Sequence, residues 1–470
     1  MNKIIKHGLI WSLLDKIINQ IIYFFILIYI GKVIGPSAFG LIGIASVFIA
    51  LTESLVNYGF SQALIQKNNI NPIEKSTIFF SSLVFSTILY LIFFFSSGEI
   101  SEYYELPDLK NIICVLLIVI IFNSINVVPR SILLIEFKYN LIAISNCIAT
   151  IISAIAAILL LNEGFSFWAF VYFNLLRTAI NTTFNFIFSK WVPSLSFSLD
   201  SLKYFARYSI FLSLSGILSA FVNNAYILFI GKYLNTFNVG LFTQSNNISS
   251  MLSGVLTSII QNIAFPILSK SKKNHKQFES DLISILKSNM LISLPVLVGF
   301  CLVSKEFTYI FLDDNWGEII PILNIFAISK IFTSLSIVNI NTMNAVGRSD
   351  LFFLSDLIKT PIIFIGIFIS IEHGLYYLSL SFLITSVISY IITVIFSNHV
   401  VKFSLQTQLS HILPFVISTI IMYFIVREIH IEDNLKSLLI KIFIGAISYF
   451  TTLILILASI NKWKKTSYDE

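Results

Sequence analysis

Long apolar stretches recur along the whole of this sequence, and they constrain its fold more than any other feature. A helix needs roughly 20 apolar residues to cross the ~30 Å hydrocarbon layer of a membrane, and about fourteen stretches meet that requirement. Only 11% of the residues are charged, whereas soluble domains carry roughly 25%, so too little polar surface remains to cover a water-soluble core. The sequence therefore predicts an all-α membrane protein with about fourteen transmembrane helices, at residues 9–30, 38–65, 77–97, 109–129, 141–161, 166–188, 208–230, 239–268, 283–303, 319–345, 352–371, 375–397, 409–426 and 437–460.

One short motif occurs twice, each time at a junction between predicted spans. Residues 30–41 share Ile-Gly-Lys at the start and Gly-Leu at the end with residues 230–241, at the same internal spacing. Such a recurrence indicates two related halves, which is the usual construction of transporters. An even number of predicted spans separates the two copies, so both junctions lie on one side of the membrane and the halves run parallel. We therefore expect two parallel six-helix lobes with a cavity between them, and two extra C-terminal helices.

The predicted boundaries follow from this repeat. We expect an N-lobe at residues 1–190 and a C-lobe at 208–400, followed by the last two spans and a cytoplasmic tail at 401–470. Residues 191–207 are predicted to be a cytoplasmic linker, because Pro193 suggests a turn and Asp200-Ser201 suggests the cap of an interfacial amphipathic helix.

Basic residues gather in alternate loops, and this asymmetry predicts the orientation. With the N-terminus inside, most loop lysines and arginines lie inside, including the segment 270–276. Acidic residues such as Glu99 and Asp313 gather on the other side. Because cytoplasmic loops carry an excess of Lys and Arg, both termini are predicted to face the cytoplasm. The net charge of +6 is explained by this topology and requires no nucleic-acid partner.

Several function classes find no support in the sequence. The three cysteines lie in apolar surroundings without the spacing of a metal site or of a disulfide framework. The loops are short and contain neither a nucleophile–base pairing nor a phosphate-binding glycine loop. We therefore predict a protein that is not an enzyme and holds no cofactor and no metal.

Charged residues inside predicted spans are the most informative positions for function. A charge at mid-bilayer costs roughly 2.5–3.5 kcal/mol on insertion scales, so it normally faces a cavity or a partner. Arg177 and Lys330 lie near the middle of their spans, where they line an aqueous path or pair with another helix. Lys16 lies nearer a span end and could instead extend to the interface. Glu53 and Asp15 are the candidates for ion coupling, and Glu53 is equally consistent with a buried ion pair.

Polar side chains also form stripes on the first, second, seventh and eighth predicted spans. Equivalent placement in the two halves favours a shared water-filled cleft, although Ser and Asn commonly join helices in membranes as well. The predicted substrate-binding residues, taken from these stripes and from the charged positions, are Lys16, Asn19, Asn57, Arg177, Asn223, Asn224, Gln244, Asn247, Gln261 and Lys330.

A series of short motifs then appears in a characteristic order along residues 10–400. They are GPSAFGL at 35–41, PR at 129–130 with EFK at 136–138, GFSFW at 164–168, FP at 265–266, FLDDNWG at 311–317 with Pro321, and GRSDL at 347–351. In this order and on this hydropathy they resemble the Wzx-type flippases. These are polysaccharide transporters of the multidrug/oligosaccharidyl-lipid/polysaccharide exporter superfamily.

The resemblance implies a function that composition alone does not. Such proteins move undecaprenyl-diphosphate-linked oligosaccharides across the bacterial inner membrane for O-antigen, capsule or exopolysaccharide assembly, and the partners implied are membrane lipids and the polymerase and chain-length machinery. The family's cavity is cationic and is lined by the first, second, seventh and eighth spans. Two alternatives remain open: an ion-coupled drug or cation antiporter of the same superfamily, and a membrane enzyme such as a polysaccharide polymerase or ligase.

Overall fold

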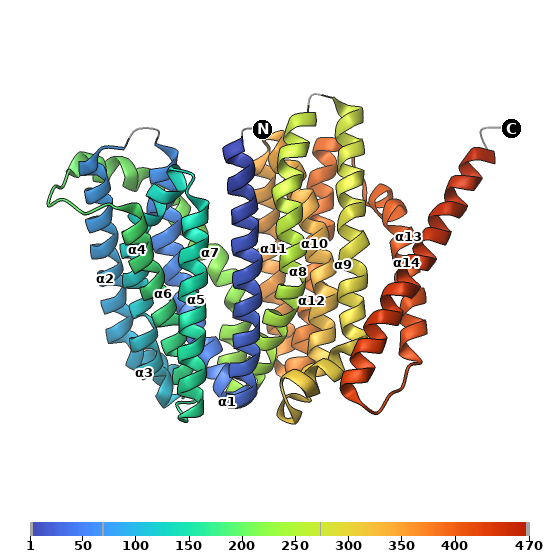
Figure 1. The fold of residues 1–470 in the computed structure, drawn as a ribbon, viewed down its shortest axis with the longest axis horizontal. Coiled ribbons are helices and arrows are strands. Elements are labelled where there is room, and N and C mark those ends of the chain that lie inside the picture. Colours follow the sequence, from blue (N-terminus) through green and yellow to red (C-terminus); the bar gives the residue numbers. More distant parts are fainter. Residues whose placement is uncertain (1–2, 68–69, 273, 467–470) are drawn as a thin grey trace. The chain divides into compact units, whose positions relative to one another are not determined.

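The computed structural model describes residues 3–67, 70–272 and 274–466, and helices joined by short turns make up nearly all of it (Figure 1). The described residues contain no strand, so the predicted all-α class is confirmed. For some positions inside helices, including the predicted site residues Asn57 and Gln261, the side chains lie outside the described part. Ten stretches of the described residues are long and apolar enough to cross a membrane.

The chain divides into two compact units, Met1–Gly240 and Leu241–Glu470. The first contains the start of α8 (Thr236–Ser271) and the helices α1 (Lys3–Gln66), α2 (Pro72–Tyr104), α3 (Pro107–Leu116), α4 (Ile118–Ile135), α5 (Tyr139–Asn162), α6 (Trp168–Ser189) and α7 (Leu199–Tyr233). The second contains the rest of α8 and the helices α9 (His275–Phe311), α10 (Ile319–Val346), α11 (Ser349–Ser370), α12 (Leu375–Val401), α13 (Leu405–Arg427) and α14 (Asn434–Thr466).

The first two predicted spans form one long helix, α1, with a kink between them. Gly35 has φ 75° and ψ 173° at this point, a conformation that a residue with a Cβ rarely adopts. Pro36 follows and begins the second half of α1, where its missing N–H is not needed for a helical hydrogen bond. The junction expected from the sequence is therefore a sharp kink without a loop. The predicted span at 109–129 is likewise divided, between α3 and α4 at Leu117.

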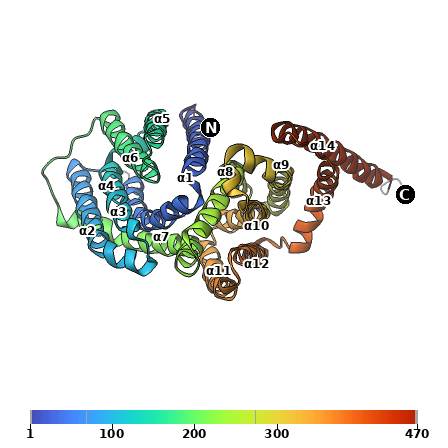
Figure 2. The same ribbon diagram turned by 90° about the horizontal axis from the view of Figure 1, so that it is seen from below.

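In the first unit, α6 packs against α4 and α5, and α1 contacts α4, α5 and α7 (Figure 2). This arrangement brings four helices with buried polar residues, α1, α4, α5 and α6, into mutual contact. α7 belongs to this unit through its extensive packing along α1. The division into two six-helix lobes stays a prediction.

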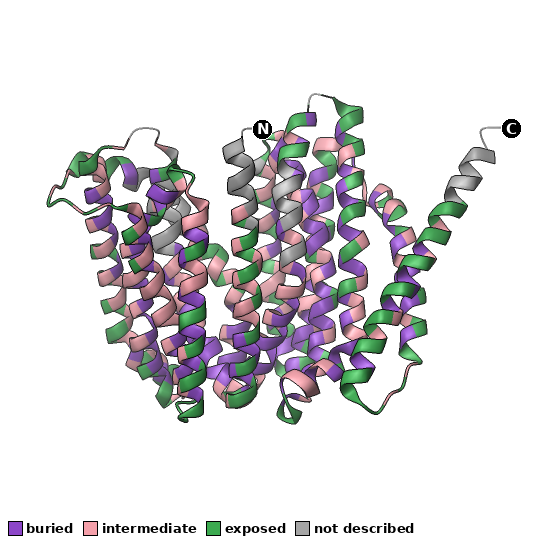
Figure 3. Cartoon of the chain, in the orientation of Figure 1, coloured by how far each residue is buried: buried purple, intermediate pink, exposed green. Residues whose placement is uncertain are grey.

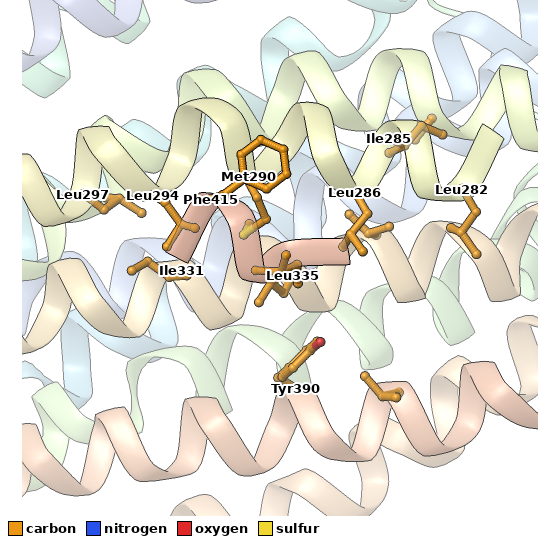
Figure 4. Close-up of a cluster of buried hydrophobic side chains, with 14 of the residues drawn as sticks. Leu282, Ile285, Leu286, Met290, Leu294, Leu297, Ile331, Leu335, Tyr390 and Phe415 are labelled. Carbon is orange, nitrogen blue, oxygen red and sulfur yellow. The ribbon is translucent and has the colours of Figure 1, made fainter. Parts of the chain in front are cut away.

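The second unit has a continuous apolar core. Leu286, Met290 and Leu294 of α9 pack with Leu335 of α10 and Phe415 of α13 (Figure 4). Residues of α9, α13 and α14, together with Leu252 of α8, also line an apolar pocket of about 360 Å³.

Much of the described part of α14 is exposed (Figure 3), and its exposed residues include large apolar ones. Phe443 and Leu455 of this helix are each 67% exposed. Exposed apolar side chains at this density are expected for a helix that faces lipid.

Candidate functional site

Asp15 is held by amide groups from two helices of the first unit. Its carboxylate accepts hydrogen bonds from Nδ2 of Asn146 at 2.9 and 3.1 Å and from Nδ2 of Asn19 at 2.6 Å. Thr150 in turn donates to Oδ1 of Asn19 at 2.8 Å. Arg130 of α4 is close enough for its charge to act on Asp15. The sequence predicted Asp15 and Asn19 as site residues, and the structure places them together with α5.

A network of asparagine amides continues from Asn146 across α5, α6 and α4. Asn181 of α6 donates to Oδ1 of Asn146 at 2.6 Å and accepts from Asn126 of α4 at 2.9 Å. Asn185 donates both to Oδ1 of Asn126, at 2.9 Å, and to Oδ1 of Asn181, at 3.1 Å. Because each amide both donates and accepts, buried amides can satisfy one another without a net charge. The network joins three helices to the Asp15 carboxylate.

Glu53, in the second half of α1, accepts a hydrogen bond from Nδ2 of Asn123 on α4 at 2.7 Å. The charge of Arg177 acts on Glu53, yet the described residues show no ion pair within 4.0 Å between them. A fixed Glu53 salt bridge, one of the two alternatives that the sequence left open, is therefore absent from the described part of the chain.

Arg177 lies in the middle of α6 with its guanidinium over two aromatic rings. Cζ is 5.1 Å from the ring centre of Tyr23 on α1 and 5.7 Å from that of Phe173 on α6. Such cation–π contacts stabilise a cation by roughly 0.5–2 kcal/mol and leave its N–H groups available. Within the described part of the chain Arg177 makes no hydrogen bond and no ion pair. Arg177 is therefore a half-buried cation whose N–H groups have no hydrogen-bond acceptor in the described part of the chain.

Lys330 is the corresponding cation of the second unit. Its Nζ donates to Oδ1 of Asn246 on α8 at 2.9 Å and lies 5.7 Å from the ring centre of Phe382 on α12. Phe382 stacks on Phe326 with the ring centres 4.6 Å apart. The oxygen of Asn246 also accepts from Ser250 at 3.2 Å. Lys330 therefore sits between one amide and an aromatic cluster, with no carboxylate within ion-pair distance among the described residues.

The other predicted site residues are not joined to these clusters by contacts in the described part. Lys16 and Asn223 are exposed, and Asn224 donates to the backbone oxygen of Ala220 one turn earlier at 2.7 Å. Asn247 is half-buried. Gln244 is fully buried, and neither atom of its amide has a hydrogen-bond partner among the described residues.

Sequence reasoning missed the asparagines that bond Asp15, Glu53 and Lys330 or extend the amide network, namely Asn123, Asn126, Asn146, Asn181, Asn185 and Asn246. One signal could have found part of this set, because Asn174, Asn181 and Asn185 recur at helical spacing along α6. The described residues hold no group of three or more His, Cys, Asp or Glu that could bind a metal ion.

Ten apolar helices in the described part of the chain define a multi-pass membrane protein. The structure is similar to that of the lipid II flippase MurJ in an inward closed conformation, with a TM-score of 0.71 and 16% identity over 97% of this chain and 98% of that one. It is also similar to an inward-facing multidrug resistance transporter of the MATE family, with a TM-score of 0.66 and 16% identity over 83% of this chain and 94% of that one. At such identities these likenesses concern the fold alone.

Residues 30–321 match the model of the polysaccharide biosynthesis protein family, and the chain belongs to this family. Curated relatives include an uncharacterized membrane protein in the cps region of Klebsiella pneumoniae, 24% identical over 94% of this chain and 93% of its own length. The teichuronic acid biosynthesis protein TuaB of Bacillus subtilis is 24% identical over 78% of this chain and 77% of its own length. The lipopolysaccharide biosynthesis protein WzxC of Escherichia coli is 22% identical over 72% of this chain and 70% of its own length. The predicted resemblance to Wzx-type polysaccharide transporters is confirmed.

Proposed function

We propose that this protein is a flippase for undecaprenyl-diphosphate-linked oligosaccharides, which it moves from the cytoplasmic to the periplasmic leaflet of a bacterial inner membrane. The product would feed O-antigen, capsule or exopolysaccharide assembly by a polymerase and its chain-length partners. Support comes from the family and from relatives named for teichuronic acid and lipopolysaccharide biosynthesis. The lipid II flippase fold agrees with a lipid-linked substrate.

The surroundings of Arg177 carry this proposal. Its guanidinium lies at the middle of a helix, over aromatic rings and without a hydrogen bond or ion pair in the described part. Its N–H groups can therefore bind an anion. Its planar fork matches the oxygens of a diphosphate bidentately, and such charge-assisted hydrogen bonds are roughly twice as strong as neutral ones. The exposed or half-buried amides would hold the sugars.

Transport would proceed by alternating access between the two predicted lobes, with both termini in the cytoplasm. Asp15 and Glu53 would couple the change to a proton or sodium gradient. A carboxyl group that binds a cation on one side of the membrane and releases it on the other lets a gradient bias two conformations. The hydrogen bonds from Asn146 and Asn123 hold the two carboxylates at fixed places for this role.

The test is replacement of Arg177 in a strain whose surface glycan depends on this protein. Arg177→Ala is expected to lower surface glycan at least tenfold while the protein still reaches the membrane. Arg177→Lys should restore it only in part, because a point charge loses the bidentate geometry. The control is Arg348→Ala, which removes an exposed arginine paired with Asp350. Normal surface glycan in the Arg177→Ala variant would remove this residue from the transport site.

A second candidate function is an ion-coupled antiporter for organic cations, favoured by the MATE-like fold and by the two carboxylates on α1. Purified protein in proteoliposomes with an imposed ion gradient separates the two. Uptake of an organic cation that is lost in Glu53→Gln would favour the antiporter. Its absence, alongside flipping of a lipid-linked oligosaccharide, would favour the flippase.

A further inference from the structure

The two copies of the sequence repeat meet in the first unit through their last glycines. Gly40 lies in the second half of α1 and Gly240 in the first turns of α8. A Cβ added to Gly40 would lie 1.8 Å from the backbone oxygen of Thr236, and one added to Gly240 would lie 2.0 Å from that of Pro36. Real Cβ atoms essentially never approach other heavy atoms within 3.0 Å, so only glycine fits at either position.

The contact is reciprocal in a way that matches the repeat. Thr236 precedes Gly240 by the same four positions that separate Pro36 from Gly40, so each glycine contacts the carbonyl of the residue that starts the other helical segment. The two glycine nitrogens are also near, because the added Cβ of one glycine would lie 2.8 or 3.2 Å from the backbone nitrogen of the other. Equivalent residues in mutual contact indicate a local two-fold relation between the helix starts.

The polar contacts at this crossing are weak, although α7 also packs along α1. The backbone approach favours Cα–H···O contacts. At the same end, Nζ of Lys232 donates to the backbone oxygen of Tyr103 at 2.6 Å and lies 3.5 Å from the carboxylate of Glu105. The Glu105 side chain is 84% exposed, and exposed ion pairs contribute little. Polar contacts of this kind can open and reform.

We propose that the Gly40–Gly240 crossing, with the Lys232 contact beside it, is a closure at the extracytoplasmic end of the transport path that must open in every cycle. The inference rests on the proposed function, which requires release on that side. It also rests on the predicted lobes, because α1 and α2 belong to the predicted N-lobe whereas most of α7 and all of α8 belong to the predicted C-lobe. In this structure the closure is shut. Opening separates α1 from α7 and the start of α8.

Alanine substitutions test the fit. Gly40→Ala and Gly240→Ala each prevent the backbones from meeting, and both are expected to lower surface glycan at least tenfold. By the two-fold relation their effects should be similar. The matched control is Gly98→Ala in α2, where an added Cβ meets nothing within 4 Å, and it should leave surface glycan unchanged.

A disulfide tests the opening. Beside the crossing, a Cβ added to Gly231 of α7 would lie 3.1 Å from Cγ1 of Ile44 on α1, so these two positions are close enough for a disulfide. In a variant whose three native cysteines are serine, the pair Ile44→Cys and Gly231→Cys should cross-link, abolish surface glycan when oxidised and regain it on reduction. The control pair is Ser86→Cys and Ser124→Cys, whose hydroxyls are 2.8 Å apart on α2 and α4 of one predicted lobe. Cross-linking it should leave surface glycan intact.

A distance measurement makes the outcome independent of the substrate. Spin labels at Val33 and Tyr233, equivalent and exposed positions of the two copies, should show two distances, the longer of which disappears when Ile44→Cys and Gly231→Cys are cross-linked. A single distance, with normal surface glycan in the cross-linked protein, would overturn the closure. Two distances in a protein that flips no lipid-linked oligosaccharide would keep the closure and contradict the proposed function.

Discussion

One carboxylate in each compact unit contacts neighbouring helices, and the two have different partners. In the first unit, Asp15 belongs to a network of neutral amides that crosses α1, α4, α5 and α6. In the second, Glu306 of α9 forms a buried ion pair with Lys441 of α14, at 2.6 Å, and also accepts from Ser437 at 2.8 Å. The second unit also holds a neutral network, formed by Asn339, Tyr390 and Gln408, so the difference concerns the two carboxylates. Amides can exchange partners without separating charges, whereas a buried ion pair resists separation, so we expect the Glu306 contact to be the harder one to open.

The largest effect is expected from breaking the ion pair of the second unit. Lys441→Ala leaves the Glu306 carboxylate buried and uncompensated, which should lower the free energy of unfolding by ~3–5 kcal/mol. Thermal unfolding of the purified protein in detergent measures this loss. The double variant Glu306→Gln with Lys441→Met should recover most of it, because no isolated charge remains.

The control is Lys436→Ala on the same helix. Lys436 pairs with Asp433 at 3.5 Å through an exposed side chain, so its loss should change stability by less than about 1 kcal/mol. Equal losses in the two lysine variants would contradict the distinction between a buried attachment and a surface pair.

An intermediate effect is expected from interrupting the amide network of the first unit. Asn181→Leu removes a side chain that bonds Asn126, Asn146 and Asn185, and it should cost ~1–3 kcal/mol for the amides left unpaired. Asn174→Leu on the same helix is the control, because the Asn174 amide bonds only the backbone oxygen of Phe170. If both leucine variants unfold at the same temperature, the network adds nothing to stability.

The smallest effect on stability is expected from Glu53→Gln. Glutamine keeps the acceptor for Asn123, so stability should change by no more than about 0.5 kcal/mol. Because the amide cannot titrate, flipping in proteoliposomes should no longer respond to an imposed proton or sodium gradient. Gradient stimulation that survives the change would exclude Glu53 as the coupling residue.

Much of the fold was predictable because the membrane imposes it. Each predicted apolar stretch falls on helix, since every backbone group in the bilayer must be satisfied within a helix. The kink at Gly35 could not be distinguished from a loop, because Gly-Pro favours both. The break between α3 and α4 also lies inside a uniformly apolar stretch that gives no signal for it.

The site was predictable where single residues carry a large cost. Arg177, Lys330, Glu53 and Asp15 stood out because a charge inside a span is expensive. The asparagines that bond Lys330, Glu53 and Asp15 did not stand out, because an asparagine in a span costs less and its partner lies on another helix. Lys330 shows what the sequence could not predict. Local periodicity favoured Asn247 as a site residue, whereas the residue that bonds Lys330 is Asn246. Only the contact between α10 and α8 determines which of the two asparagines is the partner.

Equilibrium binding tests most directly whether Arg177 binds the diphosphate of a lipid carrier. Purified protein should bind undecaprenyl diphosphate at least tenfold more tightly than the uncharged undecaprenol. Arg177→Ala should reduce that preference about tenfold, or ~1.4 kcal/mol, while Arg348→Ala leaves it unchanged. Equal affinity for the charged and uncharged lipids, or a preference that survives Arg177→Ala, would contradict the proposed role of Arg177.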